Sequence, residues 1–308
     1  MRIVVTGALG HIGSAFIRNS LFQRPEFEII LIDNLSTERY PSVFHLRGAR
    51  FSLVESGVSE ALTSDLMASA SALVHLAAIA DPGLSFSRPD EVHEHNLGIT
   101  RHVIAKCLRH GVPLVFPSST SVYGGKNPAI AESVEIPKPH SPYAQCKLAE
   151  EVVIQNAFSE GLTGAILRFG TIFGPSPGMR FHTAVNRLCW QATTGKPLTV
   201  FRAAMHQLRP YLAIQDASNA LAHTVLSRRY EQRPVNIASC NTTVADIIRE
   251  IQGTVPDLMV EEIDSPAMNE HSFGVSTSLA SSLGYRFTGD VSSGIVDTLT
   301  LLAGIRKT

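Results

Sequence analysis

The chain begins with the stretch Arg2-Ile-Val-Val-Thr-Gly7-Ala-Leu-Gly10-His-Ile-Gly13. Its apolar, β-branched start is typical of a strand that is buried on both faces of a sheet. Three glycines follow at intervals of three residues, and the residues from Ile12 to Leu21 then carry the apolar stripe of a helix. A strand, a glycine turn and a helix N-terminus together bind phosphate, because the glycines let the backbone come close and the helix end offers free N–H groups.

A carboxylate narrows the choice of phosphate ligand. Asp33 ends a second apolar stretch, Phe27 to Asp33, twenty residues after Gly13. At this position an acidic side chain accepts a hydrogen bond from the adenine ribose of a dinucleotide. Because a carboxylate repels a 2′-phosphate, we expect the cofactor to be NAD rather than NADP. The polar residues that follow, Asn34 to Arg39, are placed to contact its adenosine half.

The composition excludes several other classes of protein. The chain has 308 residues and a formal net charge of −1, so it carries no basic field that would bind nucleic acid or an anionic membrane. No apolar run is long enough to span a bilayer, and a first strand at Arg2 leaves no room for a signal peptide. The four cysteines form no CxxC pair, and the twelve histidines lack the partners of a metal site. We therefore expect a cytoplasmic protein with reduced thiols and no metal.

Alternating strand and helix patterns predict an α/β fold: a Rossmann-type, doubly wound parallel sheet with a smaller mixed α/β lid. Residues 1–170, rejoined by 213–239, are expected to form the cofactor domain, and 171–212 with 240–308 the substrate-binding lid. Further strands are predicted at 51–54, 72–78, 112–116, 165–169 and 234–238. Helices are predicted at 96–110, from Pro142 after the N-cap Ser141, and at 179–195, 213–227 and 243–251.

Tyr143 and Lys147 suggest the chemistry. Four residues apart on a helix, they share one face. A phenol titrates near pH 10, but a neighbouring ammonium and a cationic nicotinamide ring favour the phenolate and lower its pKa. The tyrosine could then take a proton from a sugar hydroxyl while hydride leaves the carbon for the cofactor. Ser119, at a strand end, could hydrogen-bond the same oxygen.

Together these motifs resemble the extended short-chain dehydrogenase/reductase family, the nucleotide-sugar epimerases and dehydratases, over nearly the whole chain. The matching residues are Thr6-Gly7-Ala-Leu-Gly10-His-Ile-Gly13, Asp33-Asn34-Leu35-Ser36, His75-Leu76-Ala77-Ala78, Asn96, Ser118 to Gly124, Tyr143-x-x-x-Lys147, Arg168 to Pro175 and Arg209-Pro-Tyr211.

The resemblance implies roles for particular residues. The catalytic set would be Ser119, Tyr143 and Lys147. The cofactor would be bound by Gly7, Gly10, His11, Ile12, Gly13, Asp33, Asn34, Leu35, Ser36, Leu76, Ala77, Ala78 and Asn96, with Tyr143 and Lys147. A nucleotide-diphosphate sugar would be bound by Ser119, Thr120, Tyr143, Thr171, Arg180 and Arg209, with the Arg209 guanidinium on the diphosphate. Helices 96–110 and 143–159 would pair with those of a second copy to form a homodimer.

Three positions depart from the family pattern. Thr120 and Ser121 stand where sugar 4,6-dehydratases carry an acidic pair, so we do not expect that elimination. Ser56-Gly57 stands near the usual site of an aspartate that contacts adenine. Thr171 replaces an asparagine that is frequent in UDP-galactose epimerases. The lid segments 171–209 and 260–271, which would choose the sugar, have the weakest sequence patterns of the chain.

Three functions remain open on the sequence. The first is an NAD-dependent epimerase that inverts C4 of a UDP-sugar through a 4-keto intermediate. The second is a reductase of NDP-4-keto sugars, which uses the same three residues but consumes reduced cofactor. The third is a non-catalytic dinucleotide sensor, which would need none of Ser119, Tyr143 and Lys147.

Overall fold

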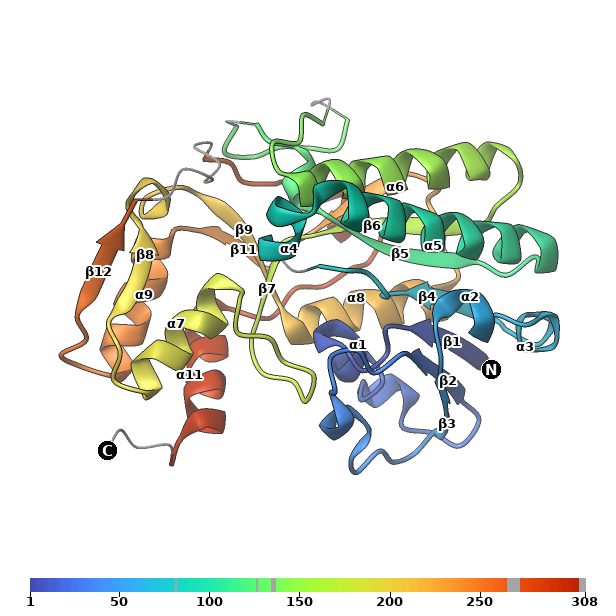
Figure 1. Ribbon diagram of the computed structural model, residues 1–308, viewed down its shortest axis with the longest axis horizontal. Helices are drawn as coiled ribbons and strands as arrows, with labels where there is room; N and C mark the ends of the chain where they lie inside the picture. Colours follow the sequence, from blue (N-terminus) through green and yellow to red (C-terminus); the bar gives the residue numbers. More distant parts are fainter. Residues whose placement is uncertain (81, 126, 134–136, 265–271, 305–308) are drawn as a thin grey trace.

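Seven parallel strands form the central sheet of the computed structural model, in the order β3-β2-β1-β4-β5-β6-β10 (Figure 1). The structure describes all residues except 81, 126, 134–136, 265–271 and 305–308. The strands are β1 (Arg2–Thr6), β2 (Glu28–Asp33), β3 (Arg50–Glu55), β4 (Ala72–His75), β5 (Leu114–Ser119), β6 (Gly164–Phe169) and β10 (Pro234–Ile237). The chain starts in the middle of the sheet and adds strands on both sides, which confirms the predicted doubly wound Rossmann-type fold.

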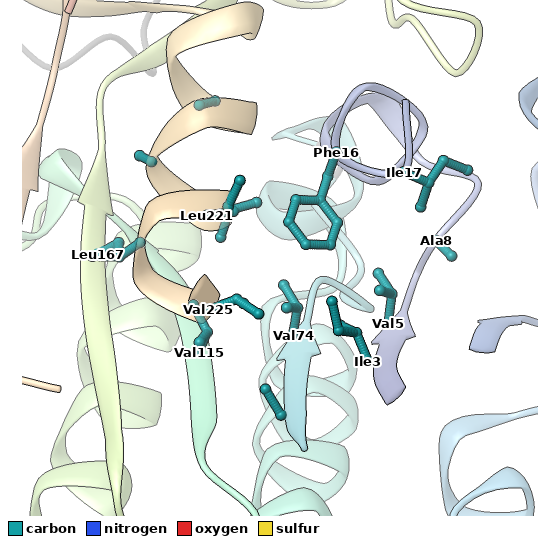
Figure 2. Packing of buried hydrophobic residues seen from close by; sticks show 14 of the residues in the cluster. Ile3, Val5, Ala8, Phe16, Ile17, Val74, Val115, Leu167, Leu221 and Val225 are labelled. Atoms are coloured by element: carbon teal, nitrogen blue, oxygen red, sulfur yellow. The ribbon is translucent and has the colours of Figure 1, made fainter. Parts of the chain in front are cut away.

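Buried side chains alternate between the two faces of this sheet, as a strand period of two requires. On one face Val5, Val74 and Leu167 lie against Phe16 of α1 (His11–Phe16) and Leu221 of α8 (Ile214–Ser227), as Figure 2 shows. The strand residues between them face the opposite way and pack against α5 (Pro89–His110) and α6 (Pro142–Ser159). The sheet is therefore covered by helices on both sides.

The helix after the glycines is shorter than the predicted 12–21, because α1 ends at Phe16. Asn19 leaves the helix and its side chain accepts a hydrogen bond from the backbone N–H of Leu21 (3.0 Å), which starts the short 3₁₀ turn η1 (Ser20–Phe22). The same side chain donates to Ser218 on α8 (2.9 Å). A capping side chain thus ends the helix where the apolar pattern would have continued it.

Two other predicted ends of helices are confirmed in detail. The Ser141 hydroxyl accepts a hydrogen bond from the N–H of Ala144 (3.2 Å) and caps α6. Gly111 ends α5 with a left-handed φ of 64°, the usual conformation for a glycine after a helix. The connections between the strands of the large sheet also contain the short helices α2 (Val58–Ala61), α3 (Ser64–Ala68), α4 (Pro82–Ser87), η2 (Tyr40–Val43) and η3 (Thr120–Val122).

A second set of elements, at the left of Figure 1, has its own apolar core. Three strands form a small sheet in the order β11-β9-β7, and two others pair as β12-β8. The strands are β7 (Thr171–Phe173), β8 (Leu198–Phe201), β9 (Arg209–Ala213), β11 (Cys240–Thr242) and β12 (Val260–Ile263), and η4 (Arg202–Ala204) follows β8. The helices are α7 (Ala184–Thr193), α9 (Val244–Thr254) and α11 (Val291–Leu302). We call this set the lid; the sequence patterns had predicted none of its strands.

The C-terminal part of the chain contributes to both cores. α10 (Ser278–Ser282) and Tyr285 join the core of the large sheet beside β10, whereas Ile295 and Leu299 of α11 belong to the lid core. The predicted domain boundaries stay a prediction, but packing alone would place α10 with the large sheet. Among the described residues no helix is long and apolar enough to cross a membrane.

Residues 174–178 form a strap that lies directly on the glycine loop. The N–H of Gly178 donates to the Ser14 hydroxyl (2.9 Å), and the Ser176 hydroxyl donates to the carbonyl of His11 (3.0 Å). A Cβ on Gly178 would lie 2.3 Å from the carbonyl oxygen of Leu9. After the strap, α7 begins at Ala184 rather than at the predicted residue 179.

Two buried histidines hold this region together. His11 Nε2 lies 3.0 Å from the carbonyl of Gly174, and burial lowers the pKa of His11 to about 4. His75, at the end of β4, lies with its Nδ1 2.7 Å from the Thr6 hydroxyl, and burial lowers its pKa to about 3. Both imidazoles are therefore neutral at physiological pH.

We expect Gly178→Ala to push the strap away from the loop, because its methyl group would meet backbone atoms. The free energy of unfolding should fall by about 1–3 kcal/mol, and the affinity for NAD should fall as well. Gly98→Ala is the matched control, since a Cβ there meets nothing within 4 Å and lies inside α5. It should stabilise by up to about 1 kcal/mol. Urea unfolding and NAD titration of both variants test this; equal behaviour of the two would contradict it.

The unfolded chain takes up protons at histidines below about pH 6.5, while folded His11 and His75 stay neutral to about 4 and about 3. The contribution of these two histidines to the free energy of unfolding should therefore be complete above about pH 6.5. It should be lost as the pH falls toward their pKa values in the folded protein. Between pH 7.5 and 5.5 the free energy of unfolding should drop by about 2 kcal/mol.

His11→Gln keeps an N–H for Gly174 but cannot titrate, so it should remove about half of that slope. The exposed His95→Gln is the control and should leave the slope unchanged. Identical slopes in wild type and His11→Gln would overturn this assignment.

Candidate active site

The three glycines of the first loop have different structural reasons. Gly7 has a φ of +63°, and a Cβ there would lie 2.6 Å from the backbone nitrogen of Ala77. A Cβ on Gly13 would lie 2.5 Å from the carbonyl oxygen of Ala8. A Cβ on Gly10 would have its nearest contact at 3.2 Å. Gly7 and Gly13 are therefore required by the fold, whereas Gly10 is the least constrained of the three, with a tight contact to the carbonyl oxygen of Gly7 only.

Asp33 is placed where a ribose can meet it. Its carboxylate accepts hydrogen bonds from the N–H groups of Leu9 and Leu35, each at 3.0 Å, and so joins the end of β2 to the glycine loop. Leu35 has a φ of 54° and its side chain joins the core of the large sheet. The neighbouring Asn34 accepts a hydrogen bond from the N–H of Ser36 (3.1 Å), and both side chains are exposed beside the loop.

Cationic side chains surround the helix end. After burial, the charges of Arg39, Arg180 and His182 also act to lower the pKa of His11. Arg39 lies beside Gly10, with its Nη1 3.8 Å from the position of a Cβ there. Ile12, next to His11, is half-buried at the start of α1. An open helix N-terminus with arginines around it fits the pyrophosphate of a dinucleotide.

The loop after β4 forms the facing wall. Leu76, Ala77 and Ala78 leave the sheet here, three residues earlier than the predicted strand end, because the N–H of Ala77 turns to the Thr6 hydroxyl (3.3 Å). Asn96 of α5 holds this loop: its amide bonds both the N–H and the carbonyl of Ile79, at 2.8 and 3.0 Å. Asn96 is thus placed to fix the wall, and its role in binding the cofactor stays a prediction.

The three residues predicted as catalytic come from β5 and α6, at the carboxyl edge of the sheet, where ligands of open α/β sheets bind. Tyr143 lies on the first turn of α6 and Lys147 on the next turn, buried behind it. Ser119 ends β5, and its hydroxyl lies 2.8 Å from that of Ser121. Burial raises the pKa of Tyr143, and the charges of Lys147 and Arg180 oppose this without outweighing it. The lowering expected from Lys147 is therefore present as one contribution only.

The residues predicted to bind substrate occupy different places. Thr171 is exposed on β7 and pairs with Tyr211 of β9, two residues from Arg209. The Arg209 guanidinium is buried in part, donates to Gln207 (2.7 Å) and lies over the Phe273 ring. The Thr120 hydroxyl is buried and donates to the carbonyl of Phe169 (3.3 Å), so it is directed into the protein.

The lid adds a pocket of about 210 Å³ that the sequence had not predicted. Its walls include Arg209 and Tyr211 of β9 with Arg187 of α7 and Phe201 of β8. Arg187 lies over the Phe201 ring, and its buried Nε has no hydrogen-bond partner among the described residues. The same guanidinium donates from Nη2 to the carbonyl of Thr199 (3.2 Å), so its Nε is the donor that is available to an anionic or strongly polar ligand. Arg187 escaped prediction because only the packing of α7 on β8 brings it to Arg209.

Among the residues that the structure describes, no three histidine, cysteine or acidic side chains are grouped as metal ligands would be. The arrangement combines a glycine loop at a helix N-terminus, a tyrosine one helical turn from a buried lysine, and an arginine-lined pocket in the lid.

The chain is similar to known proteins over most of its length. It matches the model of the NAD dependent epimerase/dehydratase family at residues 3–238. YtcB of Bacillus subtilis (strain 168), described as an uncharacterized UDP-glucose epimerase, is 30% identical over 275 residues, which cover 82% of this chain and 83% of that protein.

Solved structures give the same result. The UDP-glucuronic acid 4-epimerase of Bacillus cereus, in complex with UDP-glucuronic acid and NAD, superposes with a TM-score of 0.88 and 25% identity, covering 98% of this chain and 99% of that one. An NAD dependent NDP-hexosamine 5,6-dehydratase of tunicamycin biosynthesis has a TM-score of 0.84 and 28% identity, covering 97% and 96%. The chain therefore belongs to the NAD dependent epimerase/dehydratase family, an enzyme family whose cofactor is NAD, as the motifs predicted.

Proposed function

We propose that the protein is a nucleotide-sugar 4-epimerase acting on a UDP-sugar. The observation that carries the proposal is the placement of Tyr143 and Lys147 at the sheet edge that also carries the glycine loop. The arginine-lined lid pocket supports a substrate that binds there through a nucleotide diphosphate group. The names of YtcB and of the Bacillus cereus enzyme support a UDP-sugar and inversion at C4.

The chain's own residues divide the work as follows. Tyr143 takes the proton of the 4-hydroxyl and returns it when the 4-keto group is reduced from the other face. Lys147 favours the phenolate by its charge. Ser119 exchanges its bond with Ser121 for one to the substrate oxygen. NAD, held by the glycine loop and Asp33, would supply a hydride acceptor and donor at C4, which would make the reaction redox-neutral.

Substrate binding is proposed to involve both predicted and newly found residues. Arg209 and Arg187 are assigned to the diphosphate and the nucleotide, and Thr171 and Arg180 to the sugar side, since Arg180 lies close enough to influence both His11 and Tyr143. Thr120 is assigned no direct contact because its hydroxyl is already bonded.

The predicted homodimer, which would use helices α5 and α6, remains a proposal. These two helices pack against each other on one face of the sheet, and α6 leaves Val152 exposed. The predicted cytoplasmic location also remains a proposal.

Incubation with UDP-glucose, UDP-N-acetylglucosamine or UDP-glucuronic acid, without added reductant, should yield the 4-epimer of at least one of them. Tyr143→Phe should lower kcat by about 100- to 10,000-fold because it removes the acid/base group. Chromatography of the sugar nucleotides measures both.

Other outcomes would replace the proposal. No inversion of any UDP-sugar, together with stoichiometric oxidation of NADH by an NDP-4-keto sugar, would make the protein a ketoreductase. Loss of water from a sugar nucleotide would place it with the dehydratases, one of which shares its fold. Full biological activity of Tyr143→Phe would indicate a dinucleotide sensor.

Arg187→Met should weaken the binding of UDP by about 10- to 100-fold, since a charged hydrogen bond contributes about 1.5–3 kcal/mol. Arg202→Met is the matched control, because Arg202 lies in the same lid but is exposed and paired with Glu262 (3.1 Å). Calorimetry with UDP checks the two variants. Equal affinity of Arg187→Met and wild type would remove Arg187 from the nucleotide site.

A further inference from the structure

The helix α6 carries a buried ion pair whose acidic member, Glu150, has no part in the reaction proposed above. Lys147 Nζ lies 2.9 Å from Glu150 Oε2, and both side chains are almost completely buried. Taking an ammonium and a carboxylate out of water costs several kcal/mol for each ion, so such a pair persists only where the surroundings hold it. Burial alone would force the lysine toward its neutral form.

Glu150 is itself held from the neighbouring helix. The Thr100 hydroxyl of α5 donates to Glu150 Oε1 (2.7 Å) and lies 3.3 Å from His75 Nε2. His75 in turn lies 2.7 Å from the Thr6 hydroxyl at the start of the glycine loop. A chain of buried polar contacts thus runs from Lys147 across the sheet edge to Thr6.

We propose that Glu150 is a positioning residue: its carboxylate, held by Thr100, fixes the Lys147 ammonium behind Tyr143 and keeps it charged. The proposal deepens the function proposed above, since it gives a reason why the lysine stays a cation in a dry site. Glu150 touches no reacting atom; it acts through Lys147.

The neighbouring groups support this assignment. Burial lowers the pKa of Lys147, and the Glu150 carboxylate, the largest opposing cause, raises it above its usual value. The titratable groups that face Lys147 and Tyr143 are Cys146 and Glu150 of α6, His75 of β4, and Arg180 of the segment before α7. Phe116 of β5 lies 4.6 Å from the ammonium and adds no charge. Among these groups only Glu150 is a carboxylate.

The test compares Glu150→Gln with Glu150→Asp in NAD-saturated protein. Lysines are labelled with ¹³C at Cε, and the Lys147 signal is assigned among the six lysines with Lys147→Arg. In wild type this signal should stay at its protonated position to pH 10. In Glu150→Gln its titration midpoint should fall by at least about one pH unit, and in Glu150→Asp by less.

A purely structural role predicts the reverse order. Glutamine has the size of glutamate and keeps an acceptor for Thr100, so packing favours Gln over Asp, whereas charge favours Asp over Gln. The order of kcat should likewise be Glu, Asp, Gln. A Lys147 signal that titrates alike in wild type and Glu150→Gln would overturn the proposal.

Two further variants serve as controls for this titration. Glu151→Gln removes the next buried carboxylate of α6, which pairs with Arg168 (2.7 Å), and should destabilise the fold without moving the Lys147 titration. Thr100→Val keeps the charge but removes the donor to Glu150, and should move the midpoint in the same direction as Glu150→Gln by a smaller amount. If Glu150→Gln does not fold, an unchanged midpoint in Thr100→Val contradicts the proposal.

The titration needs no substrate. Failure of the wild type to invert any UDP-sugar would therefore end the proposed function and leave this inference to be decided separately.

Discussion

The structure depends on three close backbone approaches at the glycine loop. Gly7 lies against the loop after β4, Gly13 against the loop's own carbonyl groups, and Gly178 against Leu9. Each is possible only because a side chain is missing, and each joins a different part of the chain to the end of β1. The loop is thereby held in one shape by contacts from three sides.

Much of this fold follows from local patterns. The apolar runs that became β1, β2 and β5 are long and flanked by turn residues. Ser141 caps the start of α6 and Gly111 ends α5, each through contacts with residues close in the sequence. Such signals need only neighbouring residues. The end of α1 was misplaced because the Asn19 side chain accepts a hydrogen bond from Leu21 and also donates to Ser218, about 200 residues away, and the apolar stripe reports neither contact.

The candidate site divides along the same line. Tyr143 and Lys147 could be found because helical spacing places them together, and Asp33 because it ends a strand. Arg187 and Glu150 could not be found in this way, because tertiary contacts make them important. Arg187 has a buried Nε without a hydrogen-bond partner among the described residues, and Glu150 lies against the buried Lys147 ammonium. The lid was read poorly because its strands have three to five residues and pair across long stretches of chain.

The strap has a consequence for how the protein is made. Residues 9–14 leave the ribosome well before the strap, since their contacts with Ser176 and Gly178 involve a segment synthesised more than 160 residues later. Domains begin to fold while their chain is being synthesised, so β1 and the glycine loop stay without these contacts until residues 174–178 have been made. The glycine loop, from which the cofactor was predicted, thus completes its structure late.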